Sequence, residues 1–97
     1  MKPVIWEPPA RQEVRDALAA SATPIEFQRV IEEALQDIAS GLITHMAVRK
    51  TPYRRCDLTA LPYSIIYAEA ANEIRVVAFP HHKRRTNYWK SRLRPPP

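Results

Sequence analysis

The spacing of the hydrophobic residues changes about halfway along this chain of 97 residues, and that change limits the folds that it can adopt. From residue 23 to residue 41 the apolar side chains recur every three to four positions, which predicts a helix. Thr23 and Pro24 suit the start of this helix, and Glu26 is placed to complete a capping box. Gly41 is placed to end it. The predicted buried stripe consists of Phe27, Val30, Ile31, Ala34, Leu35 and Ile38.

From residue 53 onward the apolar residues alternate with a period of two, which is typical of strands. Three strands are expected, over residues 53–58, 61–70 and 72–79, and the loop 42–52 could add a short one. Before the helix over residues 23–41, residues 2–6 predict a strand and residues 8–20 predict another helix. The segment "NYWKSRL" (87–93) predicts a short closing helix before the final prolines.

The order of these elements predicts an α+β fold formed by one domain, residues 1–97, with 95–97 as a disordered tail. An N-terminal strand and a two-helix hairpin would pack on one face of a mainly antiparallel sheet of three to five strands, followed by the short C-terminal helix. The other face of the sheet is expected to stay partly exposed and basic.

The net charge of +5 is unevenly spread. Residues 1–43 carry a net charge of −3 and residues 44–97 a net charge of +8. A basic half favours an anionic partner, either nucleic acid or an acidic protein segment. No apolar run is long enough to cross a membrane. Cys56 is the single cysteine, so no intrachain disulfide can form, and a cytoplasmic protein is expected.

Two stretches, "RRCDLTALPYSIIY" (54–67) and "IRVVAFPHHKRRTNYWKSRL" (74–93), resemble the RelE/ParE superfamily of toxins from bacterial type II toxin–antitoxin modules. Three positions depart from the usual pattern: Leu61 replaces Phe, Lys83 replaces Arg, and Thr86 replaces Pro. The ParE-like branch, of the plasmid-stabilisation type, fits the whole sequence best. The matching residues are Arg54, Arg55, Leu58, Pro62, Tyr63, Tyr67, His81, Arg84, Tyr88, Trp89 and Arg92.

The resemblance implies a toxin that a partly disordered cognate antitoxin wraps and neutralises, in a possible hetero-oligomer. It also implies growth inhibition by binding DNA gyrase or a related replication target. A ribosome-dependent mRNA endonuclease, resembling RelE, is the alternative. Ser64 weighs against it, because that branch has an arginine after the tyrosine matched by Tyr63. A non-toxic, basic nucleic-acid-binding module is a further alternative, so whether the chain is an enzyme stays open.

The candidate site residues lie mostly in the basic half. His81, Arg84 and Tyr88 are the candidates for catalysis, although His81 is expected mainly to fix the turn after the last strand. No metal or cofactor is expected. Trp89 is expected to be packed and Tyr88 partly exposed. The candidates for binding the target or another anion are Arg54, Arg55, Lys83, Arg84, Arg85 and Arg92.

Cys56 is expected to be a small strand residue that is at least half-buried. Nothing near it in the sequence indicates a nucleophile, although the neighbouring cations Arg54 and Arg55 could lower the pKa of its thiol.

Overall fold

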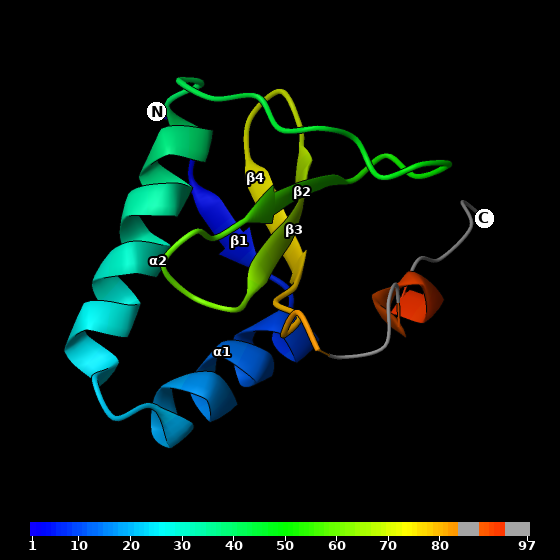
Figure 1. The fold of residues 1–97 in the computed structure, drawn as a ribbon. Helices are drawn as coiled ribbons and strands as arrows, with labels where there is room; N and C mark the ends of the chain where they lie inside the picture. The colour runs from blue at the N-terminus through cyan, green and yellow to red at the C-terminus, as the bar shows by residue number, and fades with distance from the viewer. Residues whose placement is uncertain (84–87, 93–97) are drawn as a thin grey trace.

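The computed structural model describes residues 1–83 and 88–92. It contains two helices, four strands and a closing 3-10 helix (Figure 1), which confirms the expected α+β class. The elements are β1 (Val4–Trp6), α1 (Pro8–Ala20), α2 (Pro24–Ala39), β2 (Arg54–Asp57), β3 (Ser64–Glu69), β4 (Ile74–Ala78) and η1 (Tyr88–Arg92). Each predicted strand and helix is present, usually one to three residues shorter at an end than the sequence pattern indicated.

The four strands form one sheet in the order β1-β4-β3-β2. β2, β3 and β4 follow one another as an antiparallel meander, whereas β1 pairs with β4 in parallel, with Val4 opposite Ile74. The long connection that a parallel neighbour requires is supplied by the chain between β1 and β4, which contains both helices, β2 and β3. The ladder between β3 and β4 is irregular between Ile66 and Tyr67.

The second helix ends as its sequence predicts but begins differently. After Ser40, Gly41 adopts a φ of +76°, and the Leu42 N–H bonds back to the Asp37 carbonyl at 3.1 Å. This is the Schellman pattern that favours glycine. Thr23 is the N-cap residue, but its side chain makes no cap hydrogen bond, so the expected capping box is wrong. The Glu26 carboxylate binds Arg29 instead.

The main core lies between the two helices and the sheet. Phe27, Ile31 and Ile38 of α2 pack there against Ile65 and Tyr67 of β3. The side-chain rings of Phe27, Tyr63 and Phe79 meet at one end, with 4.8 Å between the centroids of the stacked Tyr63 and Phe79 rings. The apolar stripe of α2 therefore packs against the sheet, as its helical spacing predicted.

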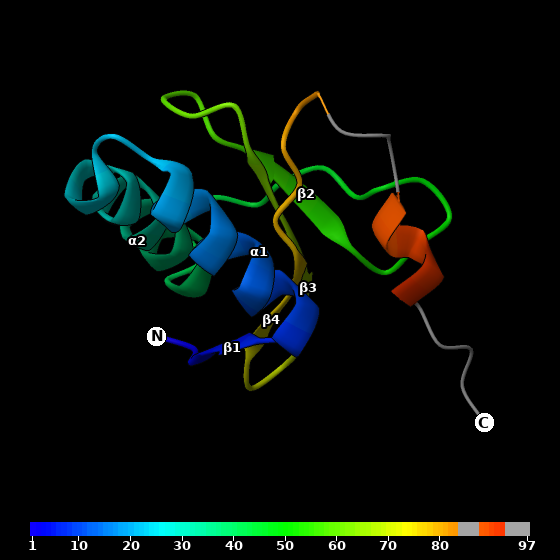
Figure 2. The same cartoon turned by 90° about the horizontal axis from the view of Figure 1, so that it is seen from below.

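The opposite face of the sheet is also covered, which corrects the expectation of an exposed basic surface. Ile66 of β3 and Val77 of β4 pack there against Trp89 of η1, which is only 1% exposed. Val48 and Tyr53 extend this second cluster. In Figures 1 and 2, η1 lies on the side of the sheet away from α2. The apolar residues on both faces of β3 and β4 account for this arrangement.

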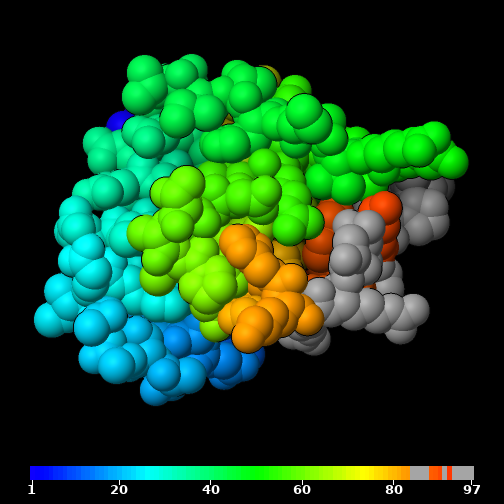
Figure 3. Space-filling view, viewed as in Figure 1, coloured from blue at the N-terminus to red at the C-terminus, as the bar shows by residue number. Residues whose placement is uncertain are grey.

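Residues 42–53 form a loop, and their strand-like pairing is limited to one bridge between Ala47 and Arg54. Beyond that bridge the chain turns back at Lys50, so residues 47–54 form a small hairpin, here called the 47–54 arm. The arm projects from the body of the molecule in Figure 1 and again in the space-filling view of Figure 3. No helix among the described residues is long and apolar enough to cross a membrane.

Candidate functional site

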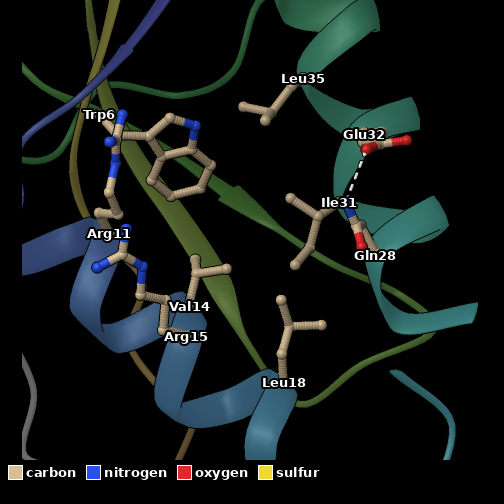
Figure 4. A pocket seen from close by; sticks show the side chains of 9 residues that line it. All are labelled: Trp6, Arg11, Val14, Arg15, Leu18, Gln28, Ile31, Glu32 and Leu35. Atoms are coloured by element: carbon tan, nitrogen blue, oxygen red, sulfur yellow. Dashed lines mark hydrogen bonds between the residues drawn. The ribbon is translucent and has the colours of Figure 1, made fainter. Parts of the chain in front are cut away.

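An apolar groove runs between α1 and α2, beside β1 (Figure 4). Val14 and Leu18 lie one turn apart on α1, and Ile31 and Leu35 lie one turn apart on α2. Each helix therefore presents a row of two apolar side chains to the other. Trp6 of β1 closes one end, and the hollow has a volume of about 210 Å³. The groove suits an apolar side-chain row from a partner better than a polar small molecule.

The two walls of the groove carry different charges. Arg11 and Arg15 are exposed on the α1 wall, and neither side chain makes a hydrogen bond or ion pair with another described residue. On the α2 wall, Gln28 Nε2 donates a hydrogen bond to Glu32 Oε1 at 3.1 Å. A partner that fills the groove would therefore meet unpaired cations along one side only.

A second site of interest surrounds the carboxylate of Glu13, whose side chain is only 12% exposed. Glu13 Oε1 accepts hydrogen bonds from the Phe79 N–H at 3.2 Å and from Arg92 Nη1 at 2.8 Å, and its Oε2 accepts one from the Tyr88 hydroxyl. Arg92 also donates to the Val77 carbonyl at 3.0 Å. These contacts fasten η1 to α1 and β4.

The Glu13 contacts give Tyr88 and Arg92 an anchoring role, although both were candidates for chemistry or anion binding. Tyr88 is half-buried and Trp89 is buried, as expected. Glu13 itself was not singled out from the sequence. One feature of the sequence could have identified Glu13. It lies three residues after Ala10, which is fully buried, and therefore on the side of α1 that faces the sheet.

His81 has the role that its sequence position indicated. Its Nδ1 accepts a hydrogen bond from the Lys83 N–H at 3.0 Å, and its ring packs edge-on against Tyr63 at 4.9 Å between centroids. A backbone bridge joins the same pair. His81 therefore fixes the turn that follows β4.

Ser64, Asp57 and His82 form a cluster of the three residue types found in serine hydrolases. Ser64 Oγ donates to Asp57 Oδ1 at 2.5 Å, and His82 Nε2 lies 3.1 Å from the same Oγ. Because the hydroxyl has a single proton and gives it to Asp57, His82 must donate to Ser64 rather than take its proton. In a catalytic triad the histidine accepts the serine proton and the carboxylate contacts the histidine. The arrangement is therefore not that of an activated nucleophile.

The cluster joins β2, β3 and the turn after β4. Ser64 is fully buried, and Arg55 Nε donates to Asp57 Oδ1 at 2.8 Å. The hydrogen bonds from Arg55 and then from Ser64 hold the pKa of the Asp57 carboxyl below its usual value. Ser64 also places no positive charge where the endonuclease branch has an arginine.

Replacing Ser64 with alanine should lower the free energy of unfolding by about 1–2 kcal/mol, because Asp57 and His82 each lose a partner. Urea unfolding measures the change, and Thr59→Ala, which removes an exposed hydroxyl in the next loop, should change it by less than about 0.5 kcal/mol. Any growth inhibition by the chain should survive Ser64→Ala. Its loss in a folded Ser64→Ala protein would instead assign Ser64 to chemistry.

The candidate cations that the structure describes, Arg54, Arg55, Lys83 and Arg92, do not form one cluster. Neighbouring residues on a strand point to opposite faces, and Arg54 donates to the His45 carbonyl at 2.6 Å while Arg55 pairs with Asp57. Lys83 is exposed at the turn after β4. Arg84 and Arg85 lie outside the described residues. Arg54 and Arg55 therefore do not form a joint clamp for an anion.

Cys56 is buried, as expected, but the idea that neighbouring cations lower its pKa is wrong. Burial, followed by the negative charge of Asp57, raises the pKa of the Cys56 thiol to about 11. The thiol stays protonated at neutral pH and is a poor nucleophile. In residues 1–83 and 88–92, no group of three or more His, Cys, Asp or Glu residues is placed to hold a metal ion.

Comparison with known proteins identifies the architecture. No protein-family model matches the chain, and no curated protein matches it. A solved structure titled "Chromosomal ParDE TA system from P. aeruginosa" contains a chain that superposes with a TM-score of 0.66 and 15% sequence identity. The match covers 84% of this chain and 96% of that chain. The chain has the fold of a ParDE toxin–antitoxin protein. The fold that the sequence resemblance implied is thereby confirmed.

Proposed function

We propose that the chain is the toxin of a bacterial type II toxin–antitoxin module and that a cognate antitoxin neutralises it in the cytoplasm. The observation that carries the proposal is the fold shared with a ParDE chain over 84% of the residues. The two matching sequence stretches, 54–67 and 74–93, support the toxin role, because they resemble the toxin family along β2, β3, β4 and η1.

The groove between α1 and α2 is the proposed docking site of the antitoxin. A disordered segment that folds on binding can place the apolar face of a helix in such a groove. Arg11 and Arg15 on the α1 wall favour acidic residues along one side of that helix. The unequal walls would fix the direction in which the helix lies.

The proposed action of the toxin is to block DNA gyrase or a related replication component by binding it, without chemistry. Two observations support binding without chemistry over RNA cleavage. Tyr88 is committed to Glu13, and Ser64 is buried in its contacts with Asp57 and His82. Lys83 remains a proposed contact with the target, together with Arg84 and Arg85, which lie outside the described residues.

Expression of the chain alone in a bacterium tests this function. Growth should stop, cells should form filaments, and plasmid DNA should lose negative supercoiling while transcripts stay intact. Trp89→Ala, expected to be destabilised by about 3–5 kcal/mol, is the control for effects of overexpression and should inhibit growth less at equal expression. Transcripts cut at ribosome-bound positions would show a RelE-like endonuclease instead. Normal growth at good expression of the folded chain would contradict the proposed toxin.

A further inference from the structure

The 47–54 arm is a hairpin closed by its own hydrogen bonds, although it projects from the body of the protein. Its two sides are joined by the Val48 N–H, which donates to the Tyr53 carbonyl at 2.8 Å. At the turn, Thr51 Oγ1 donates to the Val48 carbonyl at 2.9 Å and accepts from the Tyr53 N–H at 3.1 Å. Lys50 adopts a left-handed φ of 64° to complete the turn.

The base of the arm is fixed to the core. The Tyr53 ring packs edge-on against Trp89 at 5.9 Å between centroids, and Val48 packs into the same cluster. On the other face of the sheet, Arg54 holds the His45 carbonyl, and His45 Nδ1 lies 2.8 Å from the Tyr67 hydroxyl. These contacts hold the base of the arm against the body of the protein, which limits the conformational entropy lost when a partner binds the tip.

The tip is cationic and lacks an apolar anchor. Arg49 and Lys50 are both exposed, and neither side chain has a hydrogen-bond or ion-pair partner in the part of the chain that the structure describes. Residues 44–56 contain no Asp or Glu that could neutralise them. The aromatic ring of the arm, Tyr53, turns inward to Trp89. Figures 1 and 2 place the arm beside η1, which carries the further cation Lys90.

We infer that the 47–54 arm binds the phosphodiester backbone of a double-stranded nucleic acid, with Arg49 and Lys50 contacting phosphates. A two-stranded ribbon fits a DNA major groove, and phosphate contacts need cations but no apolar pocket. Protein interfaces instead depend on aromatic anchors buried in well-packed centres, and the only aromatic ring of the arm, Tyr53, is already packed against Trp89. The inference goes beyond the proposed toxin function, because nucleic-acid binding would be present whether or not the chain stops growth.

Fluorescence anisotropy with the whole chain tests the inference, using labelled DNA and RNA duplexes of about 20 base pairs at several salt concentrations. The double variant Arg49→Glu/Lys50→Glu should bind at least about tenfold more weakly than the unaltered chain. The slope of log affinity against log salt concentration should become shallower by about two, because two phosphate contacts are lost. Arg11→Glu/Arg15→Glu is the matched control, since it makes the same charge change on the groove wall and should bind within about threefold of the unaltered chain.

Comparing the DNA duplex with the RNA duplex shows which nucleic acid the arm binds. A loss confined to the DNA duplex identifies DNA as the ligand, and a loss confined to the RNA duplex identifies RNA. Equal weakening by the arm variant and the groove variant would overturn the inference, because it would show attraction by overall charge alone. Binding by the arm variant that equals that of the unaltered chain, or no binding of either duplex by the unaltered chain, would also overturn it.

Discussion

Replacing Trp89 with alanine is expected to lower the free energy of unfolding by about 3–5 kcal/mol. The indole is 1% exposed and fills the space between η1 and the face of the sheet formed by Ile66, Val77 and Ala78. It also supports Tyr53 at the base of the 47–54 arm. Its removal leaves a cavity beneath η1 that the fixed sheet cannot close.

Urea unfolding followed by circular dichroism measures this change. Lys90→Ala, a substitution at the next residue of η1, is the matched control and should alter the free energy of unfolding by less than about 1 kcal/mol. An unchanged unfolding midpoint for Trp89→Ala would show that the ring is exposed in solution. The second cluster of buried residues would then not contribute to stability.

The second large effect is expected for Leu18→Glu in the groove. Burial of a leucine side chain contributes about 1.5–3 kcal/mol, and a carboxylate at that point would be desolvated by the incoming helix. Since each 1.4 kcal/mol corresponds to tenfold in affinity, binding of the antitoxin should weaken by about 100-fold or more. The probe is the antitoxin that restores growth to cells expressing the chain, and calorimetry measures its affinity.

Ala19→Glu provides the matched control for the groove. It introduces the same carboxylate at the next residue of α1, which is exposed and does not line the groove, so affinity should change by less than about threefold. Because Leu18 also packs partly against the core, a melting curve must show that Leu18→Glu is folded. Unchanged affinity in a folded Leu18→Glu chain would place the antitoxin elsewhere.

Local patterns in the sequence predicted most of the fold. The apolar stripe of α2 and the glycine after it fix a helix with clear ends, and the alternation after residue 53 fixes three strands. The parallel pairing of β1 with β4 and the burial of both faces of the sheet were not apparent. Both depend on contacts between segments far apart in the chain, such as Tyr53 with Trp89.

The functional residues were harder to predict because side-chain partners decide what a charged residue can do. Arg92 is paired with Glu13, 79 residues earlier, so its charge is already partnered. Arg54 and Arg55 are adjacent in the sequence, but their side chains lie on opposite faces of the sheet and bind different partners. Arg49 and Lys50 were not predicted as site residues, since only the folded hairpin shows that this adjacent pair lies at an exposed turn.

The proposed toxin receives its antitoxin in the groove between α1 and α2. Bacterial growth is followed while the chain is expressed alone or together with a candidate antitoxin. Cells expressing the unaltered chain should stop growing when it is alone and recover when the second protein is present. Cells expressing Leu18→Glu should stop growing in both cases. Recovery of the Leu18→Glu cells would place the antitoxin outside the groove, and growth of the cells that express the unaltered chain alone would show that the chain is not a toxin.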